Sequence, residues 1–75
     1  MKELLHVIVR NLVDNKDAIT INEYTEDDVT VLELSVSNED VGKVIGKQGK
    51  IAKAIRTVVK SAASYENKKV IVKII

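Results

Sequence analysis

Two glycines three residues apart, Gly46 and Gly49, interrupt residues 41–60 of this 75-residue chain, a stretch that holds basic and apolar side chains but no carboxylate. Glycine just past an apolar run is the usual end of a helix, because it adopts backbone conformations that other residues avoid. A helix that includes Val44 and Ile45 must therefore end near Gly46, and a new helix can begin at about Gly49. The middle of the chain is thus predicted to be a tight helix-loop-helix turn.

Apolar periodicity predicts the remaining elements. Residues 2–13 carry apolar side chains at helical spacing, while residues 18–25 and 29–37 alternate as half-buried strands do, with an acidic hairpin turn between them. The helices around the glycine turn cover about 39–45 and 49–65, and residues 70–75 form a final β-branched strand. The order α-β-β-α-α-β predicts an α+β fold in which three helices pack on one face of a three-stranded sheet.

The start of the first helix after the hairpin is also predicted from local residues. Ser37 or Asn38 is expected to cap it, and Glu39 and Asp40 would favour the positive end of the helix dipole.

Composition limits the class of protein. A chain of this length with 45% hydrophobic and 31% charged residues and no proline predicts one globular domain over residues 1–75. Cysteine is absent, which excludes disulfides and thiolate metal sites. The beginning of the chain is too polar and too short to predict a signal peptide or a membrane span, so we expect a cytoplasmic protein without cofactor or metal.

Charge is distributed unevenly along the chain. Residues 1–40 hold three basic and ten acidic side chains, whereas residues 41–60 hold six basic side chains and no carboxylate. A locally basic element on an acidic protein suits a polyanionic ligand. A solvated lysine-rich helix face would have the same composition, so charge alone leaves both interpretations open.

The glycine loop itself predicts a phosphate site. Its backbone N–H groups lie at the start of a helix, where they lack intrahelical partners and attract anions. Lys47 and Lys50 add cations, and Gln48 can donate a hydrogen bond. Two glycines at this spacing also occur in ordinary helix-helix turns, so the loop indicates a phosphate site only together with the elements that surround it.

That context resembles a KH domain of the bacterial, type II-like form. The loop follows Val44-Ile45, precedes Ile51 and Ile55, and falls between the second and third helices of the predicted order. The resemblance covers essentially the whole chain, and residues 40–55 followed by a single last strand are similar to the KhpA family of small bacterial RNA-binding proteins. It implies a mixed sheet and binding of single-stranded RNA, with a role as an RNA chaperone or post-transcriptional regulator.

The resemblance also implies which residues bind RNA. The loop would clamp about four nucleotides of backbone, as KH loops do. The bases would lie on apolar residues around the loop and on the edge of the second strand near Leu34 and Val36, with Arg56 among the cations at the approach. Ala52, a further candidate for this floor, stands where the family commonly has a large aliphatic residue. The predicted RNA-binding residues are Gly46, Lys47, Gln48, Gly49, Lys43, Val44, Ile45, Lys50, Ile51 and Lys53.

The last helix suggests a subunit contact. Its apolar arc covers nearly half of the circumference, with one stripe expected to face the sheet: Ile51, Ala54, Ile55, Val58 and Ala62. The residues beside that stripe are the predicted dimer interface: Ala52, Arg56, Val59 and Ala63. The first helix could cover this edge instead. The family resemblance implies pairing of the chain with itself and with a larger KH-containing protein of the Jag/KhpB kind.

No residue pattern predicts catalysis. His6 is the only histidine and has no second ligand or nucleophile near it in the sequence, and Ser61 and Ser64 have no motif-defined base. We therefore predict that the chain is not an enzyme. The alternative function is a protein-protein adaptor without direct RNA binding, in which the basic helix contacts an acidic partner.

Overall fold

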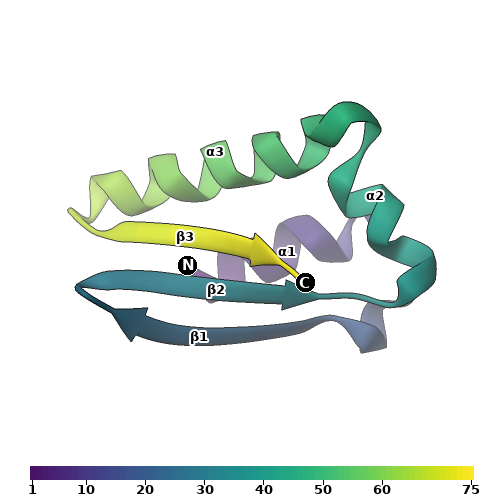
Figure 1. Cartoon of the computed structure of the whole chain (residues 1–75), viewed down its shortest axis with the longest axis horizontal. Coiled ribbons are helices and arrows are strands. Elements are labelled where there is room, and N and C mark those ends of the chain that lie inside the picture. The colour runs from purple at the N-terminus through teal and green to yellow at the C-terminus, as the bar shows by residue number, and fades with distance from the viewer.

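The computed structural model describes all residues from Met1 to Ile75. Its sheet has the order β1-β2-β3, formed by Thr20–Glu26, Val29–Ser35 and Lys69–Ile74. β1 is antiparallel to β2, whereas β3 is parallel to β2, so the sheet is mixed (Figure 1). The α+β fold with a three-stranded mixed sheet is confirmed.

The hairpin between β1 and β2 is a two-residue turn. Asp27 and Asp28 both have positive φ, at 51° and 65°. Such a turn matches the twist of the two strands, and aspartate is one of the few residues that tolerates the left-handed conformation there. The two aspartates therefore place negative charge at the hairpin and also adopt the backbone conformation that the turn requires.

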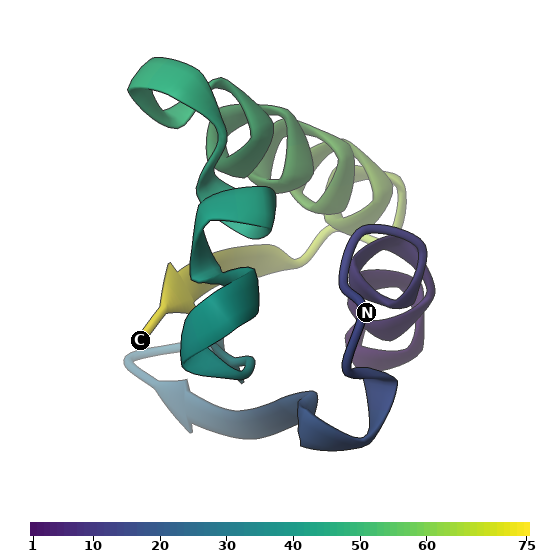
Figure 2. The ribbon, with the colours of Figure 1, turned by 90° about the vertical axis from the view of Figure 1, so that its right-hand side faces the viewer.

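Three helices, α1 (Lys2–Arg10), α2 (Val41–Ile45) and α3 (Lys50–Tyr65), cover one face of the sheet (Figures 1 and 2). α1 is shorter than the predicted 2–13, because Leu12 donates to Val9 in a tightened last turn that ends the helix. None of the helices combines the length and apolar character that crossing a bilayer requires. The core draws on every major element: Leu5, Val9, Val13, Ile21, Leu32, Leu34, Val36, Val44, Ile55, Val59 and Val72.

A buried carboxylate joins the loop before β1 to the loop after β2. Asp40 is 2% exposed, and it accepts hydrogen bonds from the backbone N–H groups of Asn15 at 3.0 Å and Asp14 at 3.3 Å. The Ser37 hydroxyl also donates to it, so Ser37 does not cap a helix as predicted. A 3-10 turn over Asn38–Asp40 leads into α2 instead. Asp40 thus holds the segment after α1 against the segment before α2.

The orientation of α3 differs from the prediction. Its buried residues are Ala52, Ile55, Val59 and Ala63, whereas Ala54 and Val58, assigned to the sheet-facing stripe, are exposed. The buried stripe is displaced by one residue along the sequence from the predicted one, which corresponds to a rotation of the helix by about 100°. Ala52, Val59 and Ala63 lie in the core of the monomer and have no surface to offer a second copy. The predicted dimer interface is wrong at these three positions.

Candidate nucleic-acid interface

The glycine turn projects from one corner of the molecule, between α2 and α3 (Figure 2). Gly46, Gln48 and Gly49 all have positive φ, at 74°, 56° and 74°. This sequence of left-handed residues reverses the chain within a single 3-10 turn, Lys47–Gly49. No side chain caps the start of α3, and the side chains of Lys47 and Gln48 are exposed. The turn therefore presents its backbone and two polar side chains to solvent.

The two glycines are needed for different reasons. At Gly46, a Cβ atom would lie 2.6 Å from Cγ1 of Ile51, so this position has neither the conformation nor the space for another residue. At Gly49, a Cβ atom would meet nothing within 4 Å. Gly46 thus allows Ile51 to pack over the turn, while the space beside Gly49 is open for a ligand.

Unpaired cations continue from the turn along α3. The ion pairs of the chain are those of Lys43 with Asp14 and Asp40 and of Lys68 with Glu66. The basic side chains of the turn and of α3 are exposed and have no carboxylate partner: Lys47, Lys50, Lys53, Arg56 and Lys60. Their charges are available to an external anion.

Lys43 differs from these cations. Its ammonium group donates to both Asp14 and Asp40, and these contacts raise its pKa above the ordinary value. The loop amides keep the pKa of Asp40 low, at about 2, with the N–H of Asn15 as the largest cause and the Ser37 and Lys43 bonds adding to it. Lys43 therefore fixes α2 in place, and its charge is already matched within the protein.

A groove between α3 and β3 continues the basic surface. It encloses about 370 Å³ and is lined by Lys53, Arg56, Thr57, Lys60, Val70, Ile71 and Val72. Nε of Arg56 donates to the carbonyl of Val72 at 3.2 Å, which joins the helix to the edge strand and leaves the outer N–H groups of the guanidinium free. The groove combines an apolar floor on β3 with cations on α3, and no carboxylate lines it.

The structure corrects the predicted floor of the groove. Val44 and Leu34 are fully buried, and Val36 is 7% exposed, so these side chains belong to the core and cannot contact a base. β2 is the central strand, and β3 provides the edge beside α3. The prediction missed Thr57, Lys60, Val70 and Ile71, while Val72, at 4% exposure, belongs to the core like Val36. The sequence did contain an indication of this groove, because the basic residues 53, 56 and 60 share one face of a helix.

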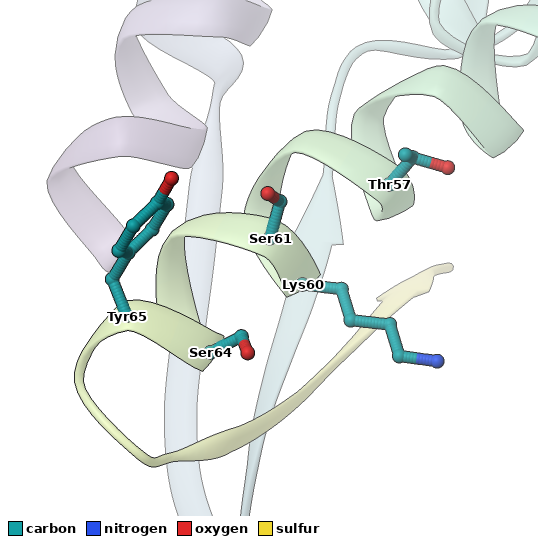
Figure 3. Close-up of a pocket in the computed structure, with 5 residues that line it drawn as sticks. All are labelled: Thr57, Lys60, Ser61, Ser64 and Tyr65. Carbon is teal, nitrogen blue, oxygen red and sulfur yellow. The ribbon is translucent and has the colours of Figure 1, made fainter.

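The opposite flank of α3 is apolar. A groove of about 360 Å³ between α1 and α3 is lined by Ile8, Leu12, Lys50, Ile51, Ala54, Ile55 and Val58. Val58 remains 48% exposed at this groove. Figure 3 shows Lys60 and Tyr65 leaving α3 in different directions, Lys60 toward β3 and Tyr65 toward the side of α1. α3 therefore separates a basic face from an apolar face.

No three histidine, cysteine, aspartate or glutamate side chains come together as possible metal ligands. His6 lies on α1 beside Thr20 of β1, away from both grooves, and makes no hydrogen bond to that hydroxyl. Ser61 and Ser64 line a shallow exposed surface of α3 with Thr57, Lys60 and Tyr65 (Figure 3). Neither serine has a hydrogen-bonded base.

Comparison with known proteins agrees with this architecture. The family model for the KH domain of KhpA/KhpB matches residues 2–74. The chain is 60% identical to the RNA-binding protein KhpA of Clostridium perfringens and 57% identical to that of Clostridium acetobutylicum, each over the full length of both chains. It is 56% identical to the KhpA of Caldanaerobacter subterraneus, again over both full lengths. No solved structure matches. The chain belongs to the KhpA/KhpB family of KH domains.

Proposed function

We propose that this chain binds single-stranded RNA, with the backbone clamped at Gly46–Gly49 and the following nucleotides lying in the groove between α3 and β3. One observation carries the proposal: exposed cations without carboxylate partners lie at the turn and at the start of α3, Lys47 and Lys50, and continue along the side of α3 that faces β3, Lys53, Arg56 and Lys60. Relatives that cover the whole chain are named as RNA-binding proteins. Their family is not enzymatic, in agreement with the prediction that the chain has no catalytic activity.

The contacts available favour recognition of the backbone over the bases. Ammonium groups and the start of α3 suit phosphate, and the affinity should fall steeply with salt. The chain has two tyrosines and no other aromatic residue, and neither lines the groove between α3 and β3. Stacking platforms of the kind that read bases in other RNA-binding folds are therefore missing, and sequence preference should be loose.

The direct test removes the charge of the turn and keeps both glycines. Lys47→Asp combined with Gln48→Asp should weaken RNA binding at least about tenfold, because two exposed side chains that would face phosphate become anionic. Lys16→Asp combined with Asn22→Asp is the matched control, since it makes the same charge change on exposed residues away from the turn. Fluorescence anisotropy with a labelled single-stranded RNA measures both. Unchanged RNA binding by the loop variant would favour the adaptor function instead.

We further propose that two copies pair through the apolar groove between α1 and α3. In a two-fold contact both copies use the same surface, and this face is an apolar groove lined by Ile8, Leu12 and Val58, of which Val58 is 48% exposed. Lys50, at one end, is the only charged residue that lines it. A larger KhpB-type KH protein is the competing partner for this face. Its binding would displace the second copy of the chain.

Pairing in this way would leave both RNA grooves accessible, because the basic face of α3 lies on the flank away from α1. A dimer would then hold two RNA segments near each other, and its avidity would offset the weak binding expected of one groove. This arrangement supports a role in helping RNAs pair, as an RNA chaperone or post-transcriptional regulator does.

A further inference from the structure

We infer that the RNA track continues beyond the α3–β3 groove into a second basic pocket, which holds the phosphates of about two further nucleotides. The inference rests on the proposed RNA binding and extends it. This turn pocket lies where α3 meets β3, encloses about 550 Å³ and includes Lys60, Ser64, Asn67, Lys68 and Lys69. It lies at the end of α3 opposite the glycine turn, roughly 22 Å along the helix axis from Gly49.

The turn pocket is continuous with the groove. Both are lined by Lys60, Val70 and Ile71, so an RNA strand that follows the groove reaches the pocket without crossing another element. Lys60 extends from α3 toward β3 at this junction (Figure 3). The apolar floor on β3 therefore continues from the groove into the pocket, under cations on both sides of the junction.

The chemistry of the turn pocket suits a sugar-phosphate chain. Three ammonium groups line it together with the Ser64 hydroxyl and the Asn67 amide, and no carboxylate does. The one ion pair nearby joins Lys68 to Glu66 at 3.8 Å, between side chains that are 62% and 52% exposed. Such an exposed pair contributes little stability, so phosphate can replace Glu66 as the partner of Lys68.

The backbone holds these lysines in a defined place. Asn67 adopts a left-handed conformation with φ of 56°, and the N–H of Lys68 donates to the carbonyl of Ala63 at 3.0 Å. The N–H groups of Glu66 and Asn67 also donate to the last turn of α3, at 3.0 and 3.1 Å. These bonds close the helix end in the manner of a Schellman motif, which orders the turn before RNA arrives.

The charge of the β1–β2 hairpin sets the end of the track. Val29 lines the turn pocket and pairs with Lys69, and the residues just before it are Glu26, Asp27 and Asp28. These carboxylates would repel a strand that continued past the pocket. The site should therefore cover about six nucleotides, of which about four lie at the glycine turn and in the groove and about two in the turn pocket.

Binding by RNAs of two lengths tests the inference. Lys68→Glu combined with Lys69→Glu should weaken the affinity for a uridine decanucleotide at least about tenfold and reduce its salt slope by about 1.4, the value for two phosphates. The affinity for a uridine tetranucleotide, measured by NMR titration, should stay within about twofold, because the groove suffices for it. Lys2→Glu combined with Lys16→Glu makes the same charge change away from the pocket and should affect the two lengths equally.

Two results would contradict RNA binding in the turn pocket. The Lys68→Glu, Lys69→Glu variant would lose affinity equally for both RNA lengths, or it would lose affinity for neither. Loss of binding to a glutamate decapeptide, with RNA binding intact, would assign the pocket to an acidic protein and also overturn it. Failure of the proposed function itself looks different, since the Lys47→Asp, Gln48→Asp variant would then bind both RNA lengths as the wild type does.

Discussion

At the scale of single residues, Asp40 explains why the glycine turn has a fixed position. Its carboxylate accepts hydrogen bonds from Asp14, Asn15 and Ser37 and pairs with Lys43, one turn before Gly46. The sequence suggested only a carboxylate at a helix start for Asp40 and a free cation for Lys43. Their partners Asp14 and Asn15 lie 25 to 29 residues away in the chain, a distance that local patterns do not report.

The pH dependence of stability tests the role of Asp40. Folding lowers its pKa from 3.8 to about 2, so its contribution is fully present above pH 3.8 and is lost as the pH falls toward 2. The difference in unfolding free energy between the wild type and Asp40→Asn, from urea denaturation, should be constant above pH 3.8 and shrink below it. Asp17→Asn, at an exposed carboxylate without a hydrogen-bond partner, is the control. A difference that stays constant down to pH 2 would contradict the anchor.

The two glycines of the turn give a second prediction at this scale. Gly46→Ala should destabilise the fold by about 3 kcal/mol, because the new methyl group meets Ile51 in addition to the strained φ. Gly49→Ala should cost only about 1 kcal/mol, since the space around it is open. Urea denaturation of the two variants measures this. Equal costs would mean that Ile51 does not pack over Gly46.

At the scale of elements, α3 shows what periodicity can and cannot predict. Its length and its start after Gly49 were predicted closely, because the glycines and the apolar repeat define them. The inward face was assigned to Ile51, Ala54, Ile55, Val58 and Ala62, whereas the structure buries Ala52, Ile55, Val59 and Ala63. Both stripes contain two alanines and larger aliphatic residues, so hydrophobicity alone does not separate them. The rotation of the helix against the sheet decides which stripe is buried, and the sequence does not state that rotation.

Two adjacent valines of α3 separate its core face from its outer face. Val58→Glu should give a folded monomer, because Val58 is 48% exposed at the groove between α1 and α3. Val59→Glu should unfold the chain, since a fully buried carboxylate costs about 4 kcal/mol or more in a domain of modest stability. Circular dichroism and analytical ultracentrifugation distinguish the two outcomes. A wild-type monomer at micromolar concentration, or a folded Val58→Glu dimer, would reject the proposed pairing.

At the scale of the whole molecule, the element order predicted a three-stranded sheet under three helices, the hairpin and the position of the glycine turn, and each of these follows from local turn chemistry or from periodicity. That the sheet is mixed was implied only by the family resemblance. The site was predicted in part, since the turn and the cations of α3 are exposed, whereas Val44, Leu34 and Val36 lie in the core. The floor could not be predicted because it depends on which strand forms the edge of the sheet. The pairing of β3 with β2 decides this, and the paired residues lie 40 positions apart in the chain.

The molecule is thus divided by α3 into a basic side, with β3, and an apolar side, with α1. The most direct test of this division is an NMR titration of the backbone amides with a single-stranded RNA. The amides of 47–50, Lys53, Arg56 and Lys60 and of 70–72 should shift, while those of Ile8, Leu12 and Val58 stay in place. Shifts confined to the apolar side, with the glycine turn unmoved, would contradict RNA binding on the basic side of α3.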